Sequence, residues 1–170
     1  MPILKHDAPE LSQVCEAVKL GESEGDDWTR TDHVSARATA REIAADLIAT
    51  IERTSNALGL AAPQLGYLKR IIAIRPLFGT PIVVMLNPHW VDCGNGMQVT
   101  EPESCLSYPR TVADVARFMF IDCEWTDLQG ERQAAKFSGI AARVIQHECD
   151  HLQGVCLVGD AWRAEQEAKA

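Results

Sequence analysis

The sequence predicts an α+β fold in which antiparallel strands surround a helix that carries the pattern H-E-x-x-H. Three observations lead to this prediction. Strand-like runs and turns fill the middle of the chain, helical patterns stand towards both ends, and no linker or internal repeat divides the 170 residues. Because a chain of this length buries a hydrophobic core without disulfides, we expect residues 1–170 to form one compact domain.

The composition limits the class of protein. The formal net charge of −8 argues against a broad nucleic-acid-binding surface. The first residues lack the apolar run of a signal peptide, and charged residues and prolines interrupt the most apolar stretch. The six cysteines form no C-x-x-C pair and no disulfide framework. We therefore expect a cytoplasmic protein that has neither DNA nor a membrane among its partners.

The N-terminal part is predicted to be helical on either side of a polar loop. Apolar residues at helical spacing predict a short amphipathic helix over residues 11–18. Residues 19–32 are rich in Gly, Asp and Glu, and are expected to form a solvated loop. A longer helix is predicted over residues 35–55, where an apolar stripe recurs and Ala is abundant.

The middle of the chain is predicted to form strands. The β-rich runs are residues 70–74, 82–87, 117–125 and 132–137, and a turn at 91–96 leads to a further short strand. Residues 127–130, Asp-Leu-Gln-Gly, are expected to form a hairpin turn. A helix then begins at about Ser138, which is suited to the N-cap position. A short polar tail follows this helix.

The last helix contains the most informative pattern, Gln146-His147-Glu148-Cys149-Asp150-His151. Two histidines four residues apart lie on one face of a helix, so both imidazoles can reach one metal ion. Glu148 follows the first histidine and can act as a general base on a metal-bound water. The alternative is a solvated helix that happens to carry these residue types.

A catalytic site of this kind normally has a third protein ligand. The longer pattern H-E-x-x-H-x-x-G-x-x-H fails here, because Leu157 stands at the position of the last histidine. Glu165 and Glu167 lie in the polar tail, which we expect to be too mobile to hold a metal. The other histidines, His6, His33 and His89, lie in terminal or turn-like segments. Cys105 is the better candidate, since a thiolate binds late divalent metals strongly, although a buried inert thiol is its alternative.

Three stretches together resemble the peptide deformylase family. The family motifs have the forms G-φ-G-φ-A-A-x-Q, E-G-C-L-S and Q-H-E-x-D-H-L. This chain has Ala-Leu-Gly-Leu-Ala-Ala-Pro-Gln at 57–64, Glu-Ser-Cys-Leu-Ser at 103–107 and the third motif at 146–152. The third motif is most similar to the organellar-type branch, but no transit segment precedes it. Ala57 and Ser104 depart from the family pattern, because both positions are usually glycine.

The resemblance implies a deformylase-like catalytic domain and a set of catalytic roles. Cys105, His147 and His151 would bind one divalent metal ion, with the fourth position left to water. Glu148 would move the proton, and the backbone N–H of Leu106 and the amide of Gln64 would stabilise the oxyanion. The reaction is removal of the formyl group from N-formylmethionyl nascent peptides, so proximity to the ribosome is also expected. Fe2+ is the metal of the family, with Zn2+, Ni2+ or Co2+ able to occupy the same donor set.

The methionine pocket has candidates from the helix itself. Val144 and Ile140 lie three and seven residues before His147 on the same face, so they and Leu58 are expected to line an apolar pocket. Plain core packing is the alternative for these three side chains. The resemblance adds Gly59 and Ser104 to the residues that bind substrate.

The sequence also offers residues that could orient the ligands, and it leaves two other functions open. Asp150 and Glu103 are candidates to orient the metal ligands, with Arg117 as a partner, unless both carboxylates are simply solvated. A non-catalytic deformylase-like homologue remains an alternative function because of Ala57 and Ser104. A zincin-type metalloprotease is a weaker alternative because of Leu157.

Overall fold

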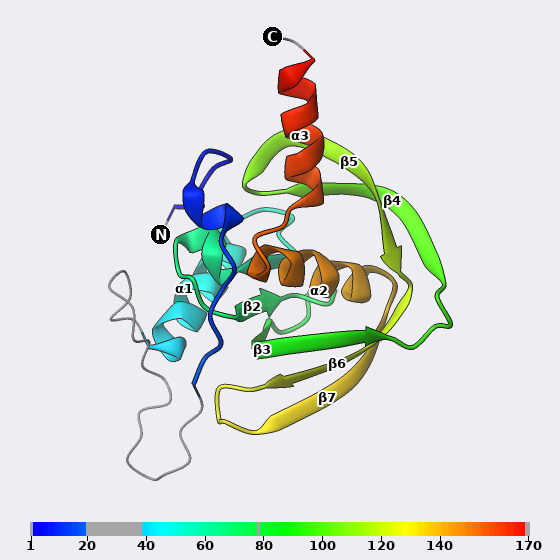
Figure 1. Ribbon diagram of the computed structural model, residues 1–170. Coiled ribbons are helices and arrows are strands. Elements are labelled where there is room, and N and C mark those ends of the chain that lie inside the picture. Colours follow the sequence, from blue (N-terminus) through cyan, green and yellow to red (C-terminus); the bar gives the residue numbers. More distant parts are fainter. Residues whose placement is uncertain (1, 20–38, 78, 169–170) are drawn as a thin grey trace.

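A computed structural model describes residues 2–19, 39–77 and 79–168 of the chain. Figure 1 shows the arrangement of the helices and strands. In chain order they are η1 (Pro9–Ser12), α1 (Ala40–Arg53), β1 (Gly59–Ala61), η2 (Ala62–Leu65), β2 (Ile71–Ile74), β3 (Val83–Asp92), β4 (Gln98–Cys105), β5 (Tyr108–Phe118), β6 (Phe120–Thr126), β7 (Arg132–Ser138), α2 (Gly139–Leu152) and α3 (Leu157–Glu167).

The strands form two antiparallel sheets. The larger sheet has the order β1-β2-β3-β6-β7, and β4 and β5 pair with one another in a separate two-stranded sheet. Helix α2 runs between the two sheets and contacts strands of both (Figure 1). The predicted α+β fold with antiparallel strands is therefore confirmed.

Strand β2 explains how two helices cover the larger sheet. All four of its residues are buried, and their side chains alternate between the two faces. Ile71 and Ala73 belong to the core that α1 covers, whereas Ile72 and Ile74 belong to the core that α2 covers. A strand that is buried on both faces reads as a continuous apolar run, as Ile-Ile-Ala-Ile does here.

The long N-terminal helix is shorter than predicted at its C-terminal end and begins within the described residues at Ala40. Its N-cap is a capping box: the N–H of Glu42 donates to Thr39 Oγ1 at 3.2 Å, and the N–H of Thr39 donates to Glu42 Oε2 at 2.6 Å. Residues 35–38 of the predicted helix, the predicted loop at 20–32 and His33 lie outside the described residues.

The amphipathic helix predicted over residues 11–18 is wrong. Only the 3-10 turn η1 forms there, and the chain after it is extended. The N–H of Cys15 donates to the carbonyl of Leu152, and Glu16 forms an isolated parallel bridge with Lys69. Contacts with distant backbone therefore replace helical hydrogen bonds, and the spacing of the apolar residues reflects burial against other elements.

The strand predicted over residues 117–125 is confirmed for residues 120–125, which lie in β6, but its first two residues belong to another strand. β5 ends at Phe118 and β6 begins at Phe120, and the two belong to different sheets. The segment 101–109, in which no regular element was predicted, contains the end of β4 and the start of β5. The hairpin turn at 127–130 is confirmed, since the N–H of Gly130 donates to the carbonyl of Asp127 between β6 and β7.

The polar tail expected to be mobile is the helix α3. Its first turn buries Val158, which packs with Cys156 and Tyr108 beside the two-stranded sheet. No helix of the described residues is long and apolar enough to cross a membrane.

Candidate active site

Helix α2 brings the two histidines of the pattern together. His147 and His151 lie on one face, and their ring centroids are 5.1 Å apart. The backbone of Phe118 holds this helix from one side. The side chain of Gln146 accepts from the N–H of Phe118 at 3.0 Å and donates to its carbonyl at 2.8 Å, as a strand partner would. Ser138 occupies the N-cap position, but its side chain makes no capping hydrogen bond.

Cys105 comes to the histidines from the other side. It is the last residue of β4, and the register of the pairing with β5 shifts between Ser104 and Cys105, so that Cys105 pairs with Tyr108. Its Sγ lies 3.3 Å from Nε2 of His151. One ligand atom from each of Cys105, His147 and His151 lies within 4.8 Å of the other two, so a single cation can reach all three.

These residues fit a metal ion. One sulfur and two imidazole nitrogens are a donor set for late divalent metals. Among the described residues, His151 Nδ1 and Glu148 Oε2 are the buried side-chain atoms that lack a hydrogen-bond partner. A hydrogen bond with Cys156, together with burial, raises the pKa of the Cys105 thiol. A cation is therefore what would hold this sulfur as a thiolate at neutral pH.

Glu148 lies beside this cluster and is almost completely buried. Burial raises the pKa of its carboxyl to about 7. Gly59 on β1 makes room for it, since a Cβ at that position would lie 2.5 Å from Glu148 Oε1 and 2.7 Å from Cγ1 of Val144. Any side chain at position 59 would therefore push the carboxylate or the wall of the site out of place.

Glu103 is the acceptor at the centre of a charged network behind His147. Its Oε2 lies 3.0 Å from Nδ1 of His147. Arg117 donates to both carboxylate oxygens, at 2.9 and 3.0 Å, and also pairs with Asp150 at 2.5 Å. Burial would raise the pKa of Glu103, but the hydrogen bonds from His147 and Arg117 outweigh it and lower that pKa to about 2.

This network orients the first histidine. Because an ionised carboxylate only accepts, Nδ1 of a neutral His147 must carry the proton, and Nε2 is left with a lone pair for a metal. The structure thus brings together Glu103, Arg117 and Asp150, the residues that the sequence suggested as orienting partners.

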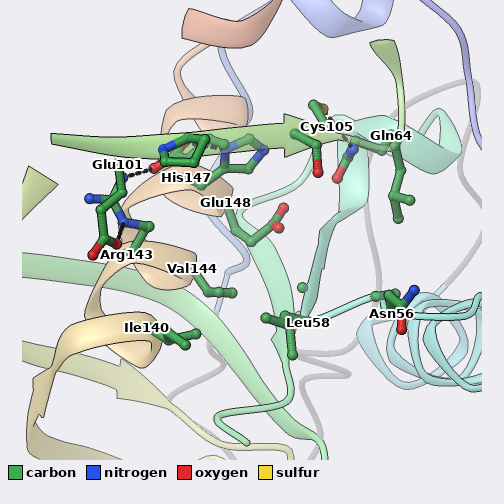
Figure 2. Close-up of a pocket in the computed structure, with 16 residues that line it drawn as sticks. Asn56, Leu58, Gln64, Glu101, Cys105, Ile140, Arg143, Val144, His147 and Glu148 are labelled. Carbon is green, nitrogen blue, oxygen red and sulfur yellow. Dashed lines mark hydrogen bonds and ion pairs between the residues drawn. The ribbon is translucent and has the colours of Figure 1, made fainter. Parts of the chain in front are cut away.

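Gln64 lies on the side of Cys105 that faces away from His147 (Figure 2). Its side-chain oxygen accepts from the N–H of Ala61 at 2.9 Å, which fixes the orientation of the amide. Its Nε2 then lies 3.7 Å from Cys105 Sγ and 3.2 Å from Ser107 Oγ. The carbonyl of Leu106 accepts from the Nζ of Lys5 at 2.9 Å, so the N-terminal segment also supports this loop.

A cavity of about 330 Å³ opens onto the cluster. Figure 2 shows Leu58, Val144 and Ile140 along one side of it, with Glu148, Gln64 and Cys105 beyond them. Ile140 is 54% exposed, so it belongs to the mouth of the cavity and not to the core. Gly59 and Ser104, which were predicted to bind substrate, also line the cavity.

Among the described residues, the histidines and acids rejected as ligands lie elsewhere. His6 stacks on Trp162 with a centroid distance of 4.2 Å, and His89 is in β3. Glu165 and Glu167 are exposed on α3, which is not the mobile tail that was expected.

Two residues at the site were not identified from the sequence. Arg143 bonds to Glu103 and lines the cavity, and its position one helical turn before His147 was the available signal. Cys156 lies against Cys105 in the same buried cluster, and no sequence pattern predicts that contact.

Comparison with known proteins identifies relatives over nearly the whole chain. A model of the polypeptide deformylase family matches residues 1–167. The peptide deformylase of Thermomicrobium roseum is 41% identical over 152 residues, which cover 84% of this chain and 85% of that protein. The peptide deformylase of Endomicrobium trichonymphae is 38% identical over 133 residues, covering 76% of this chain and 77% of that protein.

Solved structures of such proteins have the same fold. The deformylase from a Vibrio parahaemolyticus bacteriophage, in complex with actinonin, superposes with a TM-score of 0.74 at 32% identity, covering 92% of this chain and 100% of that one. The class I type b peptide deformylase of Acinetobacter baumannii with bound Met-Ala-Ser gives a TM-score of 0.75 at 28% identity, covering 93% and 96%.

Proposed function

Because the chain belongs to the peptide deformylase family, we propose that the cluster of Cys105, His147, His151 and Glu148 carries out deformylation. The protein is a metal-dependent hydrolase that removes the formyl group from N-formylmethionyl peptides and releases formate. The observation that carries the assignment of residues is the meeting of three metal-ligand atoms within 4.8 Å, beside a buried carboxylate and a cavity.

Cys105, His147 and His151 are the residues that would hold the metal ion. When bound, it supplies a Lewis acid that makes water nucleophilic near neutral pH. We propose Fe2+ as the physiological ion, since the family uses it, although Zn2+, Ni2+ and Co2+ suit the same donors. Glu103 keeps the His147 ring oriented through its hydrogen bond to Nδ1.

Glu148 is the general base and then the general acid. It accepts a proton from the attacking water and delivers that proton to the amine nitrogen of the departing peptide. Its pKa of about 7 suits a group that must take up and return a proton near neutral pH. Gly59 leaves the space in which this carboxylate lies.

The oxyanion that develops on the formyl oxygen needs donors that are already in position. Gln64 can provide its Nε2–H, because the N–H of Ala61 binds the amide oxygen and so fixes which end faces Cys105. The second donor is the backbone N–H of Leu106, whose carbonyl is held by Lys5.

The cavity is proposed to take the methionine side chain. Leu58, Val144 and Ile140 provide its apolar side. Gly59 and Ser104 also line the cavity, and we propose that they flank the peptide backbone. Met-Ala-Ser is bound to the Acinetobacter baumannii relative. Removal of the formyl group from formyl-Met-Ala-Ser would give this tripeptide, which supports formyl-Met-Ala-Ser as the substrate for the assay.

The wider setting is also a proposal. Residues 1–170 are proposed to act as one catalytic domain on nascent peptides close to the ribosome, in the cytoplasm. Its six unpaired cysteines, of which Cys93 alone is exposed, are consistent with a reducing compartment.

The direct test is formate release from formyl-Met-Ala-Ser by anaerobically purified protein, with metal analysis of the same sample. We expect turnover and about one equivalent of metal. Metal without turnover would favour a non-catalytic homologue, and cleavage of unformylated internal peptide bonds would favour a metalloprotease.

A further inference from the structure

We infer that Arg143 is a positioning residue that fixes the strand carrying Cys105 against the helix carrying His147 and His151. This inference rests on the ligand set proposed above. Arg143 lies on α2 one helical turn before His147, and only 12% of its side chain is exposed. Figure 2 shows its side chain beside Glu101 and His147 at the edge of the cavity.

One guanidinium group bonds to four acceptors on two strands. Nη1 donates to Glu103 Oε1 at 2.7 Å and to the carbonyl of Val115 at 2.9 Å. Nη2 donates to the carbonyl of Val99 at 2.6 Å, and Nε lies 3.2 Å from Glu101 Oε2. Arg143 therefore uses all three nitrogens of its planar group, and it reaches both β4 and β5.

The two-stranded sheet needs such a connection. β4 and β5 pair only with each other, so no backbone ladder joins them to the larger sheet. Among the described residues, five side chains of α2 bond to this sheet, those of Arg143, Gln146, His147, Asp150 and His151. Of these five, Arg143 alone reaches both strands. The distance from Cys105 to the two histidines therefore depends on it.

Arg143 also supports the carboxylate that orients His147. Arg117 donates to both oxygens of Glu103, and Nη1 of Arg143 adds a further donor to Oε1. Oε2 accepts from His147. Without Arg143, Glu103 loses one of its donors, and the His147 ring loses part of the support for its orientation.

The test compares Arg143→Met, which keeps a stem of similar length, with Arg143→Lys, which keeps the charge but offers one donor group. Each metal-depleted protein is titrated with Co2+ in competition with a chelator of known affinity, and the visible spectrum of bound Co2+ is recorded. Deformylation is then measured as separate kcat and KM values. Arg70→Met is the matched control, because Arg70 is also a partly buried arginine but donates to the carbonyl of Pro88, which lies outside the cluster of proposed ligands.

We expect Arg143→Met to weaken Co2+ binding about 10–100-fold, the usual effect of losing a group that orients metal ligands, and to change the Co2+ spectrum. Arg143→Lys should recover only part of the affinity, because one amine cannot reach four acceptors on two strands. The control should bind Co2+ as the unaltered protein does.

Unchanged Co2+ affinity and spectrum, with only KM raised, would overturn the inference and leave Arg143 as part of the cavity wall. If Arg143→Met does not fold, Arg143→Lys decides the matter, since wild-type affinity and spectrum in that variant would equally contradict the inference. An unaltered protein that binds no Co2+ would instead refute the proposed ligand set, and this inference would fall with it.

Discussion

Glu148 is the residue whose function depends most directly on its surroundings. It is not among the three proposed ligands, and its carboxylate has a buried oxygen without a hydrogen-bond partner among the described residues. We therefore expect Glu148→Ala to retain the metal but to lose about 10²–10⁴-fold in kcat, the usual scale of acid–base catalysis. Parallel metal analysis and formate-release kinetics measure both quantities, and near-normal turnover would remove Glu148 from the mechanism.

A second prediction at the scale of single residues concerns the metal content of a Cys105 variant. Cys105→Ala removes the only proposed sulfur ligand, so metal content should fall together with activity. The matched control is Cys123→Ala, because Cys123 is equally buried but lies in the core between the larger sheet and α2. That variant should lose stability only because of the small space that the missing sulfur leaves in the core, and it should keep its metal. A Cys105→Ala protein that holds one equivalent of metal would contradict the proposed role.

The sequence could predict residues whose relation is local. His147, Glu148 and His151 follow from helical spacing alone, and Cys105 and Gln64 from motifs that resemble a known family. Arg143 and Cys156 could not be found in this way. Arg143 and Glu103 are 40 residues apart in the sequence. Cys156 contacts Cys105 only because the chain between α2 and α3 places it in the same buried cluster.

Among the elements, α3 depends on a close approach to β5. Gly159 lies in its first turns, and a Cβ there would come within 2.5 Å of Tyr108 Cζ and 2.7 Å of its hydroxyl oxygen. In an exposed helix the change from Gly to Ala would stabilise by about 1 kcal/mol, but here the overlap with a buried ring reverses the sign.

We accordingly expect Gly159→Ala to reduce the free energy of unfolding by about 1–3 kcal/mol, measured by denaturant unfolding. The double variant Gly159→Ala with Tyr108→Ala should lose less than the sum of the two single changes, because the smaller residue removes the overlap. Additive losses would show that the two side chains do not compete for space.

Elements with strong local signals were predictable, and the rest were not. The strands around the 127–130 turn and the helix of the H-E-x-x-H pattern have turn residues or periodicity that identify them. The N-terminal segment has helical spacing, but Glu16 pairs with Lys69 instead, so tertiary contacts outweigh local preference. The division between β5 and β6 at Met119 is not visible in the sequence, because residues on both sides of it favour strands.

For the molecule as a whole, the lowered pKa of Glu103 implies that the free energy of unfolding decreases in acid. Its pKa is lowered from 4.5 to about 2 in the folded protein, so its ionised form stabilises the fold fully above pH 4.5. That contribution, on the order of 3 kcal/mol, is lost as the pH falls from about 4.5 to about 2.

Denaturant unfolding of chelator-treated protein between pH 6 and pH 3, compared with Glu103→Gln, measures this contribution. We expect the stability advantage of the unaltered protein over Glu103→Gln to shrink steadily below about pH 4.5. An advantage that stays constant over this range would mean that Glu103 is not held ionised by Arg117 and His147.

The place of Cys105 at the end of β4 also has a consequence for the order in which the molecule assembles. Cys105 and His151 are separated by 46 residues, and closing a loop of that length costs on the order of 3 kcal/mol of chain entropy. The β4–β5 hairpin and α2 are local structures that can form early, whereas the three ligand atoms meet only after the hairpin has docked on the helix. A chain that is still being synthesised is therefore expected to lack the proposed metal site until residue 151 has emerged and folded, so we expect activity to arise only as one of the last events of folding.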